Sequence, residues 1–301
     1  MTPSPAKKFA FFPGCLIPVR YPQMEAAIRK TLPKLGVEIV DLPGFTCCPD
    51  PIYFKSYDKT AWLTVAARNL VVAEEAGLNL FTICSGCTAT LSETYQQLNT
   101  NRSLRDEINK RLARVGKEYK GTSTIRHVVT VIRDEVGLDA IAASVVRPLA
   151  GLRVAIHYGC HLLKPSHIMK VDDPDDPHIL DDMVAALGAT PVRHGEWILC
   201  CGKACKDEEA PSRMMYDLLK SVAAVEADVL GVVCPSCFNE FDLGQVKLAR
   251  ERDDESLKTP AVYYFQLLGL AQGLTLEDVG LHRHKVKAPA LEKYSAAVQA
   301  R

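Results

Sequence analysis

The sequence predicts an α/β protein made of two pseudo-symmetric repeats, each a small parallel sheet flanked by helices. One pattern of five cysteines occurs twice, about 145 residues apart. Short apolar runs rich in strand-forming residues alternate with helix-like stretches, which favours parallel sheets. The cysteines follow several of these runs directly, so we expect them in loops at the carboxyl ends of the strands, where sites in such sheets gather.

The cysteine pattern is the strongest evidence for duplication. The first five cysteines read C-x31-C-C-x35-C-x2-C, and the second five read C-x39-C-C-x32-C-x2-C when Cys205 is left out. Flanking text repeats too: "FAFFPGC" at 9–15 parallels "VAIHYGC" at 154–160, and "IRHVVTVI" at 125–132 parallels "AVYYFQLL" at 261–268. Such self-similarity at a fixed spacing indicates internal repeats. The two sets are Cys15, Cys47, Cys48, Cys84 and Cys87, and Cys160, Cys200, Cys201, Cys234 and Cys237.

Each half is expected to form a Rossmann-like sheet. "KFAFF" at 8–12 and "LRVAIHY" at 152–158 are strand-like and are each followed by Gly and Cys. "GLNLFTICSGC" at 77–87 and "ADVLGVVCPSC" at 227–237 each place a buried strand directly before a CxxC turn. Helix-like stretches lie between the strands, at residues 58–77, 103–116, 125–136, 177–188 and 208–227.

The repeats suggest a division of the chain into two domains and a tail. A boundary near "VVRPLAGL" (145–152) separates an N-terminal repeat at 1–148 from a C-terminal repeat at 149–280. Residues 281–301 are polar and basic, and we expect them to form a tail or docking segment.

Composition limits the class of protein. The chain has 301 residues, 48% hydrophobic and 24% charged, with zero formal net charge. This balance implies no basic face, so nucleic acid is not an expected partner. The apolar run after the N-terminal lysines is too short for a signal peptide, and no stretch reaches the roughly 18 apolar residues of a membrane helix. We therefore expect a cytoplasmic protein without a membrane segment.

Eleven cysteines in such a chain indicate metal or redox chemistry rather than a disulfide framework. Four thiolates satisfy a tetrahedral zinc or a cubane cluster, so five in each repeat is one more than either needs. Adjacent cysteines suit a larger, multi-iron centre, and the pattern lacks carboxylate and imidazole ligands. Zinc in one of the motifs remains an open alternative.

At this point the chain resembles a known family. The pattern is similar to the signature of the CCG domain, and a tandem pair resembles the B subunit of heterodisulfide reductase, including related proteins of sulfur oxidation. "AFFPGC", "CCPDP", "RYPQMEAAIRK", "AARNLVVAEEAGL" and "HYGCHLLKPS" carry the resemblance, which covers nearly the whole chain. The text departs from the family after each cysteine pair: Pro49 stands where the motif name has glycine, and "CCGKACKDEE" introduces Lys203, Cys205 and Lys206.

The resemblance implies two noncubane [4Fe–4S] clusters, each similar to fused [3Fe–4S] and [2Fe–2S] units held by five cysteines. It assigns Cys15, Cys47, Cys48, Cys84 and Cys87 to one cluster. It assigns Cys160, Cys200, Cys201, Cys234 and Cys237 to the other. These ten residues are therefore the expected metal ligands, and they act in catalysis through the clusters.

The resemblance also implies a reaction and partners. The family cleaves the disulfide CoM-S-S-CoB in a two-electron step between two facing clusters. Electrons arrive from an iron–sulfur partner, the C subunit of the complex, which is supplied by a flavoprotein partner, the A subunit. Two other interpretations remain open: a component of a sulfur-oxidising complex that acts on lipoate-bound sulfur, and an electron-relay component with zinc in one motif.

Several other residues are weaker candidates. His157 and His161 flank Cys160 and are candidates for a hydrogen bond to sulfur or for proton supply, with a purely local structural role as the alternative. Lys164, and likewise Arg20, is a candidate for binding anionic substrate groups; surface ion pairing is the commoner fate. Cys205 is a spare thiol, either a packing residue or a sulfur carrier.

Two further motifs are expected to be structural. His282 and His284 form an HxH pair that we expect to be exposed to solvent rather than to bind metal. The acidic run "DDPDDP" at 172–177 is typical of a turn with helix-capping acids, not of a carboxylate metal site.

Overall fold

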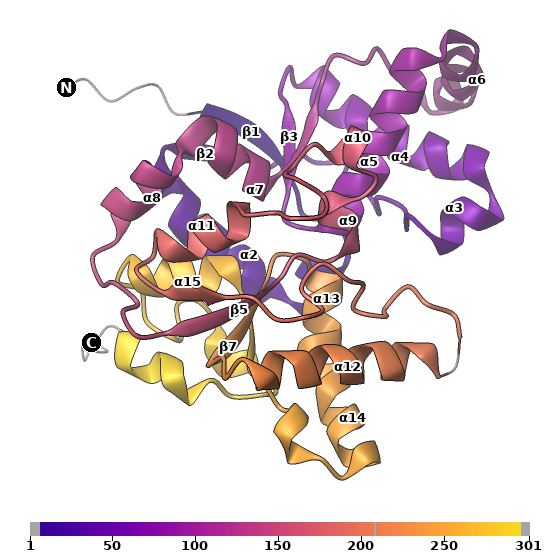
Figure 1. The fold of residues 1–301 in the computed structure, drawn as a ribbon. Coiled ribbons are helices and arrows are strands. Elements are labelled where there is room, and N and C mark those ends of the chain that lie inside the picture. The colour runs from indigo at the N-terminus through magenta and orange to yellow at the C-terminus, as the bar shows by residue number, and fades with distance from the viewer. Residues whose placement is uncertain (1–6, 208, 296–301) are drawn as a thin grey trace.

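The computed structural model describes residues 7–207 and 209–295 and contains two four-stranded sheets whose strands are all parallel. The order is β2-β1-β3-β4 in the first sheet and β6-β5-β7-β8 in the second, so the two halves share one topology. This confirms the predicted fold class of two α/β repeats (Figure 1). The strands are β1 Lys7–Phe12, β2 Val37–Val40, β3 Leu80–Thr82, β4 Ile125–His127, β5 Arg153–His157, β6 Thr190–Val192, β7 Val229–Val232 and β8 Ala261–Tyr263.

The central strands are the apolar runs that precede the cysteines. β1 pairs with β3, with Phe11 opposite Phe81, and the two rings stack with their centroids 5.1 Å apart. β5 pairs with β7 in the same way, with Val154 opposite Val229. All four side chains are buried, as the continuous apolar runs of a parallel sheet require. The residues that follow these strands therefore emerge together at one edge of each sheet.

Two of the predicted helices in the first half form nearly where expected, and one prediction needs correction. The stretches 58–77 and 103–116 correspond to α4 and α6, and the α4 amide of Ala61 donates to the N-cap carboxylate of Asp58 at 2.9 Å. The stretch 125–136 begins as strand β4, because its first residues pair with β3. The helices are α1 Leu16–Arg20, α2 Pro22–Thr31, α3 Tyr53–Tyr57, α4 Lys59–Glu75, α5 Ser85–Thr100, α6 Arg102–Leu112, α7 Val128–Val131 and α8 Leu138–Ser144, with a π-helical turn at Ile132–Val136 and 3-10 turns at Leu32–Leu35 and Ala113–Val115.

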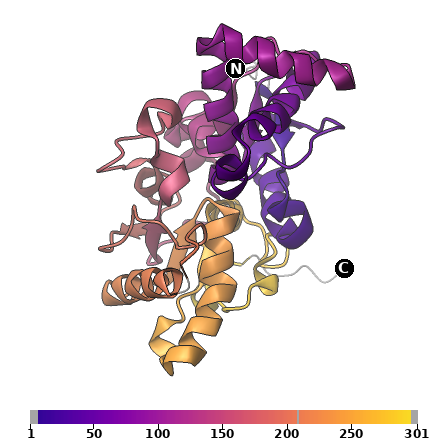
Figure 2. The same cartoon turned by 90° about the vertical axis from the view of Figure 1, so that its right-hand side faces the viewer.

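Helices of the second half cover its sheet in the same manner. The predicted helices at 177–188 and 208–227 appear as the shorter α11 and α12. Figure 2 shows α12 and α14 on the side of the molecule away from the first half. The helices are α9 Cys160–Leu163, α10 Ser166–Met169, α11 Ile179–Ala185, α12 Ala210–Ala224, α13 Pro235–Asn239, α14 Gln245–Arg252 and α15 Tyr264–Ala271, with a π-helical turn at Glu240–Gly244 and 3-10 turns at Glu255–Leu257, Leu281–Arg283 and Pro289–Tyr294.

The two halves pack directly against each other. Helix α15 of the second half lies beside α2 of the first (Figure 1). Lys30 forms an ion pair with Asp278 at 2.7 Å, and the hydroxyl of Tyr21 donates to the side-chain oxygen of Asn239 at 2.6 Å. The boundary at 148/149 stays a prediction, but contacts on both sides of it hold the repeats together.

The described part of the segment that begins at residue 281 packs against the core instead of forming a free tail. Leu291 and Tyr294 are buried, and the Tyr294 hydroxyl donates to the Ala150 carbonyl at 2.7 Å. The expectation that His284 is exposed is wrong: it is 2% exposed and its ring packs against Phe238. His282 is exposed, as expected. Residues 296–301 lie outside the described part of the chain.

Within the described residues, no helix combines the length and the apolar character needed to cross a lipid bilayer.

Candidate active site

The structure brings all ten repeated cysteines to one cavity of about 290 Å³ between the two halves. The reason lies in the strand order: Cys15 and Cys84 follow β1 and β3, while Cys160 and Cys234 follow β5 and β7. The carboxyl ends of the central strands of both sheets therefore open onto the same space. Cys205, the eleventh cysteine, is half-buried and is not part of this lining.

A glycine before the first cysteine of each set is required by close packing against sulfur. Gly14 and Gly159 have φ values of 70° and 73°, which L side chains rarely adopt. A Cβ atom at Gly14 would lie 3.0 Å from Sγ of Cys87, and one at Gly159 would lie 3.2 Å from Sγ of Cys237. The repeated Gly-Cys dipeptide thus lets the backbone approach the CxxC turn in both halves.

Each CxxC turn begins a helix. Cys84 is the N-cap of α5 and Cys234 the N-cap of α13, so Cys87 and Cys237 lie in the first turn of these helices. A helix N-terminus favours negative charge, which suits thiolate ligands. Helix α5 was not among the predicted helices. Its sequence, "CSGCTATLSETY", begins inside the CxxC motif and is rich in threonine, so it lacks a clear helical pattern at its start.

The two cysteines of each adjacent pair are buried to different extents. Cys47 is exposed and Cys48 is 5% exposed, while Cys200 is half-buried and Cys201 is 4% exposed. In both halves the first cysteine of the pair is thus on the open side and the second is inside. An object that takes both sulfurs must extend from the interior toward the mouth of the cavity.

The thiols are close enough to perturb one another strongly. Sγ of Cys160 lies 3.8 Å from Sγ of Cys200. The hydrogen bonds that Cys200 accepts, first from Cys160, lower its pKa to about 2, and the same contact raises the pKa of Cys160. Contacts first with Cys237 and then with Cys84 lower the pKa of Cys234. Within the second set, two thiols are thus held as thiolates by neighbours whose own pKa values are raised, among them Cys160 and Cys237.

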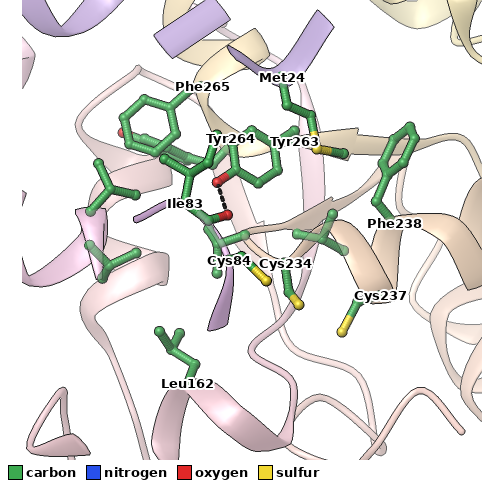
Figure 3. Close-up of a cluster of buried hydrophobic side chains, with 14 of the residues drawn as sticks. Met24, Ile83, Cys84, Leu162, Cys234, Cys237, Phe238, Tyr263, Tyr264 and Phe265 are labelled. Atoms are coloured by element: carbon green, nitrogen blue, oxygen red, sulfur yellow. Dashed lines mark hydrogen bonds between the residues drawn. The ribbon is translucent and has the colours of Figure 1, made fainter. Parts of the chain in front are cut away.

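The cavity joins the two cysteine sets. Cys84 of the first set and Cys234 of the second are in side-chain contact, and Figure 3 shows them beside each other. The hydroxyl of Tyr263, at the end of β8, donates to the carbonyl of Ile83 at 2.7 Å (Figure 3). One half therefore holds the residue that precedes the CxxC turn of the other half.

The donor set fits an iron–sulfur centre. Five thiols in each half line the cavity, and the one carboxylate that the described residues add to the lining, that of Asp50, accepts the backbone N–H groups of Ile52 and Tyr53. Thiolates are the ligands that iron–sulfur clusters and zinc prefer in proteins. Over the described residues, no three His, Cys, Asp or Glu side chains are grouped so that they could hold a single metal ion.

The other predicted site residues divide into two groups. His161 lines the cavity, and its Nδ1 lies 3.4 Å from Sγ of Cys160. Lys164 and Arg20 are exposed and do not line it. The acidic run forms the expected turn: the Asp172 carboxylate accepts the amides of His178 and Ile179 at the start of α11.

The structure also brings further residues to the site, and two of them, Lys203 and Lys206, belong to the segment after the second cysteine pair that departs from the family pattern. Lys203 lines the cavity and forms an ion pair with Glu240 at 2.8 Å. The ammonium of Lys206 lies 4.6 Å from the ring centroid of Tyr53, which links the two halves beside the cavity. His127 occupies the position in the first repeat that Tyr263 has in the second, and burial lowers its pKa to about 4. The parallel between 125–132 and 261–268 was the signal that could have found this last pair.

Comparisons with known proteins agree with this geometry. The family model of the "Cysteine-rich domain" CCG matches twice, over residues 9–92 and 154–242. The chain is 35% identical over 284 residues to the B subunit of a "Ferredoxin/F(420)H(2)-dependent CoB-CoM heterodisulfide reductase" from Methanosarcina acetivorans, covering 93% of this chain and 94% of that one. It is 30% identical to the "8-methylmenaquinol:fumarate reductase membrane anchor subunit" of Wolinella succinogenes, covering 95% and 99%.

The fold also recurs in a solved structure. A hypothetical protein from Helicobacter pylori matches with a TM-score of 0.75 at 18% identity, covering 95% of this chain and 53% of that one. This likeness supports the α/β fold alone. The two matches of the family model and the ten converging cysteines together show that the chain belongs to the CCG cysteine-rich domain family, as an iron–sulfur redox subunit related to the B subunits of heterodisulfide reductases.

Proposed function

We propose that this chain is the catalytic component of a multi-subunit disulfide reductase and cleaves a small disulfide of the CoM-S-S-CoB type between two noncubane [4Fe–4S] clusters. The observation that carries the proposal is the single cavity lined by both five-cysteine sets. The set that begins at Cys15 would hold one cluster, and the set that begins at Cys160 would hold the other. Two redox centres that share one cavity would match a substrate with two sulfur atoms.

The reaction consumes two electrons and two protons, breaks one S–S bond and yields two thiols. When bound, each cluster would supply one electron and a soft site for one sulfur. The chain's own residues shape the space: Ile17 and Ile52 give the cavity apolar walls, and His161 is placed to hold a proton beside Cys160. Lys203 contributes an ammonium group to the lining, and it offers charge for an anionic substrate group.

Partners follow from the same proposal. The relatives are named as subunits of reductases, so we propose that an iron–sulfur partner (the C subunit) and a flavoprotein partner (the A subunit) deliver the electrons. Exposed Cys15 and Cys47 are on the side of the first set that a donor reaches most directly.

A second candidate is electron relay without disulfide chemistry. It is favoured by the Wolinella relative, whose name couples a quinol to fumarate rather than to a disulfide. A protein that acts on lipoate-bound sulfur in the oxidative direction shares the cavity chemistry and differs only in substrate and direction.

The deciding experiment starts from the chain purified without oxygen. About eight irons and eight sulfides per chain would support two four-iron clusters, and consumption of CoM-S-S-CoB with a low-potential dye would support disulfide reduction. Clusters without turnover of this disulfide or of a lipoyl disulfide, in the presence of the partner proteins, would favour relay. Zinc without sulfide would overturn all of these functions.

A further inference from the structure

A buried histidine distinguishes the second half of the site from the first. His157 ends β5 and is 1% exposed. The equivalent residue of the first repeat is Phe12, which ends β1 and is fully buried. Each ring packs edge-on against a phenylalanine: His157 against Phe241 at 4.9 Å and Phe12 against Phe45 at 5.2 Å. The duplicated core thus places an imidazole where the other copy has a hydrocarbon ring.

The polar atoms of this imidazole have no partner within the described protein. Neither Nδ1 nor Nε2 of His157 makes a hydrogen bond to the residues that the structure describes. Burial lowers the pKa of His157 to about 3, so the ring is neutral at pH 7 and carries one N–H. Leaving a buried donor unpaired is unfavourable, because the group has lost its hydrogen bonds to water. The equivalent Phe12 has no polar ring atoms to satisfy, so of the two repeats only the second needs an acceptor at this position.

The ring lies near the second cysteine set. A Cβ atom at Gly159 would lie 3.6 Å from Nε2 of His157 and 3.2 Å from Sγ of Cys237, so both atoms border the same glycine. The thiolates of Cys200 and Cys234 are also near enough to act on the imidazole electrostatically. His161, the other histidine near Cys160, is half-buried and already contacts that sulfur. Of these two histidines, His157 is therefore the one whose ring nitrogens lack a hydrogen-bond partner among the described residues.

We propose that His157 donates its ring N–H to a sulfur of the second redox centre and makes that centre easier to reduce than the first. The inference rests on the proposed function in one respect, that both five-cysteine sets hold iron–sulfur clusters. An N–H donated to sulfur offsets negative charge on the centre and raises its reduction potential. Phe12 offers no such donor to the first centre. The first electron to arrive therefore resides beside Cys160 and Cys237.

The test is a redox titration of the full chain loaded with iron and sulfide, followed by electron paramagnetic resonance. We expect two reduction steps, and Cys160→Ser identifies the step of the second centre by deleting it. His157→Phe, which copies the first repeat, should lower the reduction potential of that step by about 59 mV or more, which is a tenfold change in the equilibrium constant for one electron. His157→Gln keeps a donor near the position of Nε2 and should restore the reduction potential of the second step. Phe12→His is the reciprocal variant and should raise the reduction potential of the first centre.

The outcomes separate this inference from the proposed function. If His157→Phe keeps its iron and its disulfide turnover while the second step stays unmoved, the inference is wrong and the function stands. If the wild-type chain binds no iron–sulfur centre, both fail. If His157→Phe does not fold, the His161→Gln chain carrying nitrogen-15-labelled histidine decides, because this substitution removes the other imidazole that contacts Cys160. A nitrogen coupling to the second centre in double-resonance spectra supports the hydrogen bond, and its absence contradicts it.

Discussion

At the scale of single residues, the site depends on where sulfur and backbone come close. The glycines before Cys15 and Cys160 have left-handed φ values and leave room only for a hydrogen atom beside the sulfurs of Cys87 and Cys237. The two repeats solve the same steric problem in the same way. A side chain at either glycine would add backbone strain and displace a cysteine sulfur that lines the cavity.

We predict that Gly14→Ala costs roughly 1–2 kcal/mol of folding stability from backbone strain and also lowers the iron content. Gly116→Ala is the matched control, since Gly116 has a φ of 68° and nothing within 4 Å of its added Cβ. The control should lose similar stability in a denaturant titration and keep its iron. Equal iron loss in both variants would show that strain, not the sulfur contact, matters.

Buried histidines add a dependence on pH. Burial lowers the pKa of His284 from 6.5 to about 4. The unfolded chain then binds more protons than the folded one below pH 6.5, so stability is fully present above that pH and falls as the pH drops toward 4. The effect of this residue is on the order of 2–3 kcal/mol at pH 4.

The measurement is urea unfolding of the full chain between pH 7 and pH 4, and His284→Gln should flatten the curve relative to the wild type. Exposed His282 supplies the control, because His282→Gln removes a histidine that is not buried. A wild-type curve that both substitutions leave unchanged would contradict a role for His284.

At the scale of elements, the last strand of the second sheet supports the cysteine turn of the first half. Tyr263 reaches from β8 to the carbonyl of Ile83, directly before Cys84. His127 holds the equivalent place at the end of β4. The Tyr263 bond thus couples the second sheet to the residue that precedes the CxxC turn of the first half, and the geometry of the first cysteine set depends on the other repeat.

We predict that Tyr263→Phe destabilises the chain by about 1–3 kcal/mol, because it leaves a buried carbonyl unpaired, and changes the spectrum of the first iron–sulfur centre. Tyr264→Phe is the control: its hydroxyl donates to Met183 at 3.0 Å within the second half. Both variants should lose stability in thermal unfolding, but only Tyr263→Phe should change the resonance signal. Unchanged signals in both would rule out coupling through this bond.

At the scale of the whole molecule, duplication produces one shared cavity rather than two separate sites. Helix α15 lies on α2, and the segment from Leu281 to Ser295 closes against the core. This arrangement turns the carboxyl ends of both sheets toward each other. Cys84 and Cys234 meet where the two sets join.

We predict that removal of one ligand from either set abolishes disulfide cleavage while leaving the other centre in place. Cys15→Ser and Cys160→Ser should each lose about half of the bound iron and nearly all turnover, because the proposed cleavage needs one sulfur to be accepted in each half. Cys205→Ser, outside the cavity lining, should retain both. Substantial turnover with one intact centre would contradict cleavage between two centres.

Much of this protein is determined by its sequence alone. The repeated cysteine spacing established the duplication, and the strand-like runs before Gly14 and Gly159 identified the central strands, because burial on both faces leaves an apolar run that can be read directly. The local sequence pattern gave a wrong prediction where strand pairing determines the structure. Residues 125–127 have a helix-like pattern, but they form β4 because they pair with β3. His284 looked exposed for a similar reason, since its burial depends on the distant Phe238.

The tertiary structure alone decided how the two repeats meet. No spacing within one repeat specifies that both cysteine sets line one cavity, that Tyr263 crosses to Ile83, or that His157 is left with an unpaired donor beside Cys237. These features arise from packing between segments more than 100 residues apart or from burial, and neither is encoded in a local pattern. The sequence therefore determined the ten repeated cysteines and the duplication, and the packing of one repeat on the other determined the site.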